Sequence, residues 1–433
     1  MARKKELALS EEKKLTEHLF RRKYGEILAA LLRCLGYRNF ELAEEAVQTA
    51  FQRALEVWPY SGIPINPAGW LYSVARNASL EALRRKQTEA QKISQLQLES
   101  QQFSEEKLAC EDLDLQLDDL LAMILLCCNP ELSPKAQVSL TLKAACGFSV
   151  KEIARALGMA EEAIKKTITR AKEKVAADPA LLQDLNQQRI ADRFPLVLET
   201  LYAMFTEGHS ASGGESQLRR EIAEEAIRLA GLILPSKFTP DDSKGELQAL
   251  LALMLLQGAR FDARADRNGT PLRLQDQDRG KWNQGMIRAG LAALAASKIS
   301  KQMTAYHIEA RIAAEHSTSP SFDAINWETI LALYEQLLAF KGSQDVKLNR
   351  IVALRYAKGA VVALQELQTF ASTDLVSGAD SAARTFLFHA TKADLLESLE
   401  RTVEAIQEWG KALENAPTAA DRSFVEEKLK KLS

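Results

Sequence analysis

Apolar residues recur at helical spacing along residues 41–58, ELAEEAVQTAFQRALEVW. The stripe consists of Leu42, Ala46, Val47, Ala50, Phe51, Ala54, Leu55 and Trp58. A stripe of this kind on one face predicts an amphipathic α-helix. The acidic and amide side chains are expected elsewhere on its surface; they are Glu41, Glu44, Glu45, Gln48 and Gln52. That surface is either a solvated face or an acidic docking surface for a basic partner.

A second pattern, over residues 149–175, predicts two short helices joined by a tight turn. Apolar positions line the first helix at Val150, Ile153, Ala154 and Leu157, and the second at Ile164, Ile168, Ala171 and Val175. Gly158 permits the turn between them, which gives the helix–turn–helix arrangement of many DNA-binding proteins. In that motif the N-terminal part of the second helix enters the major groove. The alternative is an ordinary pair of helices with a charged exterior.

Polar positions on the second of these helices suit nucleic acid. Lys165, Lys166, Thr169, Arg170 and Lys172 fall off the apolar stripe. Cations there can neutralise phosphates, and arginine or threonine can reach base edges. Basic residues outnumber acidic residues over 151–175, although the whole chain has a formal net charge of −2. A nucleic-acid site must therefore be a local patch.

Capping residues mark several helix boundaries. The pairs Asn-Pro at 66–67 and Ser-Pro at 133–134 each combine an N-cap with proline at the first helical position. Ser149 with Glu152 three residues later predicts a capping box, and Gly147 ends the preceding helix.

The composition favours an all-α protein. Of the 433 residues, 46% are hydrophobic and 26% are charged, while glycine and proline are sparse. No long apolar run predicts a transmembrane helix, and the charged start MARKKELALSEEKK does not resemble a signal peptide. The five cysteines match neither a disulfide framework nor a zinc pattern. We therefore expect a cytoplasmic protein with reduced thiols.

Motifs for catalysis are missing from the sequence. No nucleophile elbow, phosphate-binding loop, zinc-protease or dinucleotide-binding motif occurs, and there are only five histidines. We expect no enzyme activity, no catalytic residues, no cofactor and no metal site.

Four segments differ in composition. Residues 10–86 and 113–176 are dense in helical patterns, and residues 87–112 between them are rich in Gln, Ser and Glu. A segment of that composition cannot bury a core and indicates a linker. A helical remainder runs from about residue 193 to residue 433. We expect two helical domains, a polar linker between them, and a long helical extension.

The order of these patterns resembles the σ70-type sigma factors of the extracytoplasmic-function group. The residues that carry the resemblance are AEEAVQTAFQRALEVW, the proline-started helix WLYSVARNASLEALRR and, after the polar linker, EIARALGM with AIKKTITRAKEKV. In that family, region 2 grips RNA polymerase and melts the −10 promoter element, and region 4 reads the −35 element. The resemblance covers residues 10–176. It implies a factor that binds core RNA polymerase and promoter DNA and directs transcription initiation, with residues 87–112 threading the polymerase.

Three sets of contact residues follow from the resemblance. Polymerase binding is expected from Glu44, Glu45, Gln48 and Phe51, where Glu45 replaces the aspartate of many members. Contact with the −10 element is expected from Arg76, Asn77, Glu81, Arg84, Arg85 and Lys86, where Glu81 stands at a position that is more often aspartate. Contact with the −35 element is expected from Lys165, Lys166, Thr169 and Arg170.

The helix at 67–86 has the chemistry that strand opening requires. Asn77, Glu81 and Arg85 share one face at i+4 spacing. Amide and guanidinium groups can hold a base that has left the stack, and aromatic rings can support it. We assign Trp70 to the core, while Tyr72 suits the core and the DNA equally well.

Beyond residue 193 the chain resembles a subgroup of these sigma factors with a large helical extension that includes tetratricopeptide-like helices. The best single repeat is 388–417, with Ala390, Leu396, Ala405, Trp409, Ala412, Leu413 and Pro417 near the expected pattern. Residues 326–358 form a degenerate neighbour, and we expect tetratricopeptide-like character over 323–433. The extension either regulates the DNA-binding domains, by intramolecular contact with them, or is a required part of the active factor.

Two polar stretches of the extension stand out, at 201–214 and 263–283. They contain Glu207, His209, Asp276 and Asp278, whose spacing matches no metal-ligand pattern. Each stretch is either a contact surface or a polar network that fixes loops.

The adjacent Cys127 and Cys128 are followed by Asn129 rather than by the histidine common in related sequences. We expect buried thiols there.

A rival hypothesis is a DNA-binding regulator that acts without polymerase. The helices similar to region 2 argue against it, because a simple regulator does not need them. The sequence leaves the promoter, the activating signal and the oligomeric state open.

Overall fold

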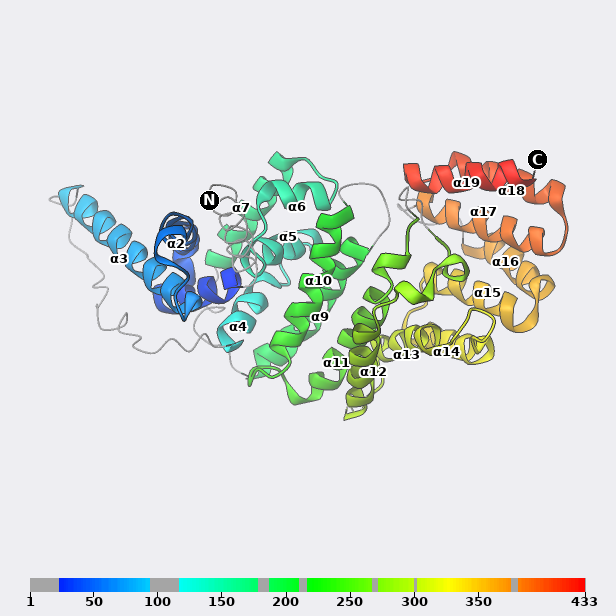
Figure 1. Cartoon of the computed structure of the whole chain (residues 1–433), viewed down its shortest axis with the longest axis horizontal. Helices are drawn as coiled ribbons and strands as arrows, with labels where there is room; N and C mark the ends of the chain where they lie inside the picture. The colour runs from blue at the N-terminus through cyan, green and yellow to red at the C-terminus, as the bar shows by residue number, and fades with distance from the viewer. Residues whose placement is uncertain are drawn as a thin grey trace, which may run out of the picture. The chain divides into compact units, whose positions relative to one another are not determined.

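The computed structural model describes residues 23–93, 117–177, 187–209, 216–266, 272–299, 302–374 and 381–432. Within these ranges the structure consists of helices and their connections, which confirms the all-α prediction (Figure 1). The chain divides into two compact units. Unit 1 comprises Met1–Met204 and Arg228–Pro240, and unit 2 comprises Phe205–Ile227 and Asp241–Ser433. Among the described helices, none combines the length and apolar character of a membrane span.

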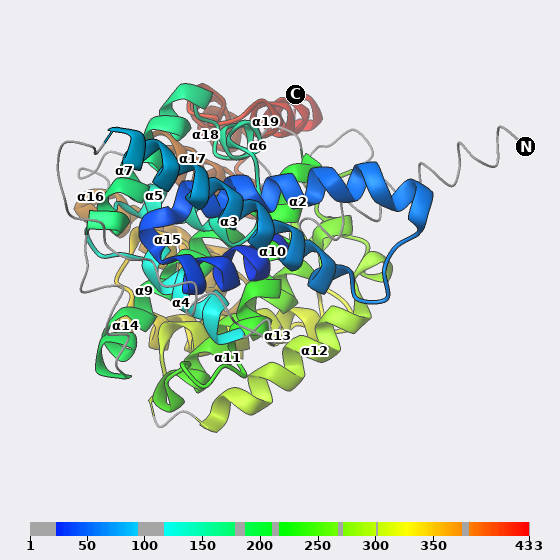
Figure 2. The same cartoon turned by 90° about the vertical axis from the view of Figure 1, so that its left-hand side faces the viewer.

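The described part of unit 1 starts with a helix that covers residues 23–35, followed by the 3₁₀-helix η1 (Tyr37–Asn39). The following helices are α2 (Phe40–Ser61), α3 (Pro67–Ile93), α4 (Leu117–Cys127), α5 (Pro134–Ala144), α6 (Val150–Ala156) and α7 (Glu161–Ala177). Most of α9 (Gln187–His209) and the end of α10 (Ser216–Ile233) also belong to this unit. Helices α2 and α3 pack against each other, and Figure 2 shows them crossing.

The amphipathic face predicted for α2 is present. Its stripe is buried at Leu42, Ala46, Val47, Ala50, Phe51, Ala54 and Trp58. Leu55 was expected in this stripe but is 45% exposed, because it lies at the edge where the helix surface turns toward solvent. Asn66 caps α3 as predicted, since its side-chain oxygen accepts a hydrogen bond from the Gly69 N–H at 3.0 Å. Trp58 and Trp70 pack across the two helices with ring centroids 5.5 Å apart.

The predicted helix–turn–helix consists of α6 and α7. The Ser149 N–H donates to the Glu152 carboxylate at 2.8 Å, and the Glu152 N–H donates to the Ser149 hydroxyl at 3.2 Å, which completes the capping box. Gly158 has a φ of 62°, a conformation that favours glycine and permits the turn. The apolar positions of α7 are buried at Ile164, Ile168, Ala171 and Val175. The local sequence therefore determines this motif.

Unit 2 contains the start of α10 and a series of further helices. They are α11 (Asp241–Gly258), α12 (Gln284–Ala296), α13 (Ala305–Thr318), α14 (Trp327–Phe340), α15 (Gln344–Lys358), α16 (Ala360–Asp374), α17 (Ser381–Ser398), α18 (Thr402–Glu414) and α19 (Ala419–Leu432). Short 3₁₀-helices connect α11 to α12, namely η3 (Phe261–Ala263), η4 (Leu274–Asp276) and η5 (Arg279–Lys281), and η6 (Ser297–Ile299) follows α12.

Neighbouring helices from α13 to α19 pack on one another in chain order, from yellow to red in Figure 1. The pairs α14–α15 and α17–α18 fall on the two repeat-like stretches of the sequence. Trp409, the large residue of the better repeat, is buried in a cluster with Ala393, Ala412 and Val425. The pairing of consecutive helices explains the small and large residues of the pattern, because small residues let the neighbouring helix approach.

Candidate nucleic-acid interface

The outer face of α7 carries the four residues predicted to contact the −35 element. Lys165, Lys166, Thr169 and Arg170 are all exposed. Within the described residues, none of these three cations forms an ion pair, so a phosphate needs to displace only water from them. The first turn of α7 carries Glu161 and Glu162 instead. Those carboxylates stabilise the positive end of the helix dipole but repel phosphate. The surface of α7 that can attract DNA therefore begins one turn further along the helix.

A second exposed face lies on α3. Asn77, Glu81 and Arg85 project from it, as their spacing predicts, and Arg84 is exposed as well. Arg85 and Glu81 form an ion pair at 3.8 Å, with side chains 80% and 69% exposed. Such an exposed pair contributes little to stability, so both groups can exchange it for contacts with DNA. Arg76 is half-buried, and the side chain of Lys86 lies outside the described residues.

The aromatic residues of α3 belong to the core. Tyr72 is only 4% exposed and its hydroxyl lies 3.6 Å from the Cys34 sulfur, so the structure decides between the two interpretations in favour of packing. Sequence reasoning missed two apolar side chains before α3, Tyr60 at 92% and Ile65 at 107% exposure. Their place beside the glycine and prolines of GIPINP was the available signal, because such a turn cannot bury them locally.

The four candidate polymerase-binding residues on α2 separate into two pairs. Glu45 and Gln48 are exposed, whereas Glu44 and Phe51 are only 7% and 4% exposed. The expectation that Glu44 lies on the helix surface is therefore wrong. Its position next to the apolar stripe brings the carboxylate under two lysines from distant parts of the chain.

Glu44 accepts contacts from three side chains. Its carboxylate oxygens lie 2.7 Å from the Lys143 ammonium and 2.5 Å from the Lys172 ammonium, and the Tyr24 hydroxyl donates at 3.3 Å. Burial by itself would raise the pKa of Glu44, but the two lysines outweigh burial and hold that pKa below its ordinary value. Burial and the neighbouring carboxylate raise the pKa of Tyr24. Glu44 is thus an ionised, fully paired carboxylate.

Comparison with protein families matches both of these helical parts. Sigma-70 region 2 matches residues 19–89 and Sigma-70 region 4 matches residues 122–175. A family of unknown function (DUF6596) matches residues 193–298. The chain is an extracytoplasmic-function-type σ70 factor with a C-terminal extension. Its sigma domains imply binding to core RNA polymerase and promoter DNA, and they belong to a non-enzymatic family.

The sigma factor also resembles one relative over nearly its whole length. An uncharacterized protein of Rhizobium meliloti (strain 1021) is 35% identical over 410 residues, which cover 94% of this chain and 93% of the relative. The extension is therefore part of what the two proteins share. No solved structure matches the sigma factor.

The polar stretch 263–283 of the sigma factor fixes loops in unit 2. Asp278 accepts a hydrogen bond from the Gly280 N–H at 2.9 Å. Arg273 pairs with Asp276 at 2.8 Å. Arg279 donates to the backbone carbonyls of His316 and Ser319 at 2.9 and 2.6 Å. These bonds supply the polar network that was one of the two interpretations, and they hold η5 against the end of α13.

Among the described residues, no group of three or more His, Cys, Asp or Glu side chains that could hold a metal ion occurs. Glu207 and Asp276 are exposed, and the side chain of His209 lies outside the described residues. Cys127 and Cys128 are buried as expected, and the Cys128 thiol donates to the Thr200 hydroxyl at 3.3 Å. Burial raises the pKa of Cys128 to about 12, so this thiol stays protonated and unreactive.

A cluster of half-buried basic residues lies beside the polar stretch. The guanidinium carbons of Arg279 and Arg260 lie 4.4 and 6.0 Å from the ring centroid of Trp282. Burial, with Arg264 and Arg279 nearby, lowers the pKa of Arg260 to about 10. Burial, together with the nearby Arg260 and Arg279, lowers the pKa of His316 to about 4, so this imidazole is neutral. Within the described residues no carboxylate pairs with Arg260 or Arg279.

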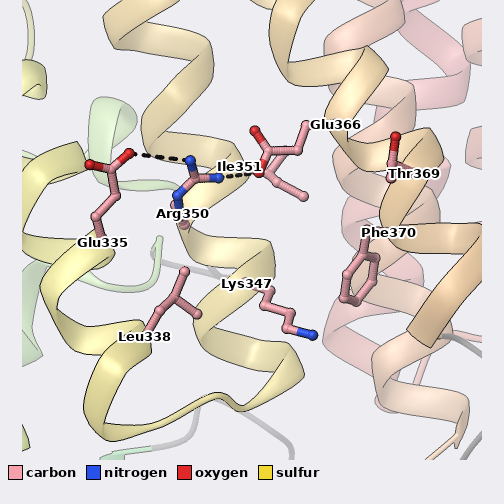
Figure 3. A pocket seen from close by; sticks show the side chains of 8 residues that line it. All are labelled: Glu335, Leu338, Lys347, Arg350, Ile351, Glu366, Thr369 and Phe370. Atoms are coloured by element: carbon pink, nitrogen blue, oxygen red, sulfur yellow. Dashed lines mark hydrogen bonds and ion pairs between the residues drawn. The ribbon is translucent and has the colours of Figure 1, made fainter.

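A groove of about 500 Å³ opens between α14, α15 and α16. Figure 3 shows Arg350 between Glu335 and Glu366 on its wall. The arginine pairs with Glu335 at 3.2 Å and also with Glu366. Because two carboxylates already compensate this cation, it does not offer a free charge to an anionic ligand.

Proposed function

We propose that this sigma factor directs promoter-specific initiation by dividing three tasks among three helices. Residues 10–86 form region 2, in which α2 binds core polymerase and α3 acts on the −10 element. Residues 113–176 form region 4, in which α7 reads the −35 element, and residues 87–112 connect the two. This function places the protein in the cytoplasm, where its polymerase and promoters are.

The exposed face of α7 is the observation that carries the proposal. Lys165, Lys166, Thr169 and Arg170 lie outside the packed stripe of a capped helix–turn–helix, so their positions are set by the fold and their side chains are exposed. Cations on such a helix bind phosphates, and arginine and threonine can bond base edges. Residues on a rigid helix can read a sequence without first ordering a loop.

Single substitutions on this face test the DNA part of the proposal. Replacing Lys166 by Ala should weaken binding to a −35 duplex about uniformly across sequences and lower the salt dependence by about one phosphate contact. Replacing Arg170 by Ala should cost about 1–3 kcal/mol and relax specificity if it bonds a base. Arg288→Ala, which removes an exposed cation on α12 outside the helix–turn–helix, is the matched control. Equal affinities at two salt concentrations would remove α7 from the interface.

The extension from residue 193 onward has two candidate roles. It either regulates the sigma domains through intramolecular contact or is required for an active factor.

In-vitro transcription with core polymerase and a genomic promoter library tests the function of the full chain. Specific transcripts support the promoter-specificity role. DNA binding without initiation, with a core that works with another sigma factor, favours the regulator that acts without polymerase.

A further inference from the structure

Polar atoms without a partner gather in one part of unit 2. Within the described residues, the segments 277–282 and 316–317 carry five buried side-chain atoms that have no hydrogen-bond partner. Four of them can donate, namely Arg279 Nη2, Trp282 Nε1, Ser317 Oγ and, in one tautomer, His316 Nδ1. The fifth, Gln277 Oε1, is an acceptor. Because a buried donor without an acceptor costs stability, this group of donors requires an explanation.

Contacts among these residues hold the donors close to one another. The Nη1 group of Arg279 donates to two backbone carbonyls at the end of α13, one of which is that of His316. The guanidinium carbons of Arg279 and Arg260 lie 4.4 and 6.0 Å from the ring centroid of Trp282. The His316 ring packs edge-on against Trp327, with centroids 5.6 Å apart. Loop bonds thus use one side of the Arg279 guanidinium and leave Nη2 without an acceptor.

The positive charge of this cluster has no counterpart nearby. Within the described residues, no carboxylate pairs with Arg260 or Arg279, and Arg264 lies close enough to lower the pKa of Arg260. The carboxylates of Asp276 and Asp278 are bonded to other groups. Fixing of loops explains the Nη1 bonds of Arg279, but it explains neither the Arg260 cation nor the unused donors. An anion that accepts hydrogen bonds would satisfy both.

The chemistry of the cluster favours the phosphate group of a small molecule. A guanidinium presents its N–H groups in a fork that matches phosphate oxygens, and a dianion compensates two arginines where a carboxylate compensates one. Trp282 is only 3% exposed, so its N–H lies too deep for the backbone of a nucleic-acid strand. Arg260 stays partly exposed and gives a small ion access.

We propose that Arg260, Arg279 and Trp282 form a binding site in the extension for the phosphate group of a small molecule. Arg260 makes the first contact and turns with the anion toward Arg279 Nη2 and the Trp282 N–H, which then bond its oxygens. The dianion supplies the negative charge that the cluster lacks, so unit 2 becomes more stable as the phosphate compound becomes more concentrated. The site lies within unit 2 and does not depend on the proposed promoter function.

Hydrogen exchange of the full-length chain with and without millimolar inorganic phosphate tests the proposal. At about ten times the Kd, peptides from α11 and α13 should exchange about tenfold more slowly. Phosphate also stabilises folded proteins generally, because it is excluded from their surfaces. Peptides from residues 23–35 in unit 1 measure that general effect, and acetate at the same ionic strength is the control for a monoanion.

Two substitutions remove parts of the site. Arg260→Met should abolish the protection by phosphate. Trp282→Phe keeps an aromatic ring and removes the N–H, so it should lose most of the protection and serves as the test if Arg260→Met does not fold. Arg288→Met, on the exposed surface of α12, is the matched control and should be protected like the wild-type chain. Exchange without phosphate shows whether each variant is folded.

Methyl phosphate distinguishes the source of the phosphate group. Stronger protection by inorganic phosphate assigns the site to the free ion, and equal or stronger protection by methyl phosphate assigns it to a phosphate ester. Absence of protection by both compounds would overturn the proposal. Protection that persists in both test variants, or equal protection by acetate, would overturn it as well, because the effect would then not come from a phosphate site at these residues.

Discussion

The charge cluster around Glu44 in unit 1 and the arginine cluster around Trp282 in unit 2 are compensated in different ways. In unit 1, Glu44 is surrounded by Lys143 and Lys172 at 2.7 and 2.5 Å. In unit 2, Arg260 and Arg279 lie against Trp282, and no described carboxylate pairs with either. Paired charges specify which surfaces meet, because breaking a single pair is costly. A desolvated cation without a carboxylate partner, such as Arg260, lowers the stability of the fold that holds it. The Glu44 cluster suits a specific contact between two surfaces. The arginines at Trp282 are expected to lower the stability of unit 2.

The largest expected effect comes from breaking the paired cluster. Lys172→Met should destabilise the packing of α7 against α2 by about 3 kcal/mol, because it leaves Glu44 with one lysine and also removes the ammonium over Phe40. Hydrogen exchange of residues 23–35 measures this free energy. Lys151→Met, on the exposed surface of α6, should leave it unchanged, and an equally small effect of Lys172→Met would show that the pairing does not hold the regions together.

A fall in pH should lower the stability of unit 2 before it affects the Glu44 cluster of unit 1. His316 has a pKa of about 4 in the folded protein and an ordinary value of 6.5, so the unfolded state binds more protons between these values. Unit 2 should therefore lose stability as the pH falls from 6.5 toward 4, by up to about 3 kcal/mol. The pKa of Glu44 is lowered, so its contribution should persist until the pH falls below its ordinary 4.5.

Peptide-resolved exchange at pH 7 and pH 5 checks this difference. Unit 2 peptides around α13 and α14 should lose protection at pH 5 while the 23–35 peptides keep theirs. His316→Gln should remove most of the pH dependence in unit 2. If His316→Gln loses the same protection at pH 5 as the wild-type chain, another titratable group causes the effect.

The smallest effect should have the opposite sign. Arg260→Met removes a buried cation that has no carboxylate partner and keeps an apolar side chain against Trp282. We expect a neutral change or a stabilisation of up to about 2 kcal/mol, measured by exchange of α11 and α14. The exposed Arg288→Met on α12 serves as the control. A clear destabilisation by Arg260→Met would show that the arginine has a compensating partner and would weaken the comparison.

The sequence predicted what neighbouring residues decide. The caps at Asn66 and Ser149, the turn at Gly158 and the buried stripe of α7 all depend on positions within four residues of one another. Tyr72 could not be assigned, because an aromatic ring on an amphipathic helix suits a core and a ligand equally. The burial of Glu44 could not be predicted, since its partner Lys172 is 128 residues away in the sequence. A weak signal existed in Lys143, the one lysine late in an otherwise mostly apolar helix.

The contact residues for polymerase and DNA remain predictions, because they depend on partners that the sequence describes only by resemblance. The structure sharpens them by exposure. It leaves the α7 set exposed and divides the α2 set in two. It also shows two exposed apolar side chains, Tyr60 near the end of α2 and Ile65 just before α3.

The packing of α9 and of the end of α10 into unit 1 fixes the number of copies of the extension per sigma factor. Cys128 bonds Thr200 of α9, and Asp118 accepts a bond from Ser236 at 2.6 Å and pairs with Lys237 at 3.0 Å. A chain cut directly after the helix–turn–helix would lose these bonds and part of its own core. A separate partner protein is diluted by growth and must be made in matching amounts. A covalently joined extension is present at one copy per sigma factor at every expression level, so its effect cannot be titrated away.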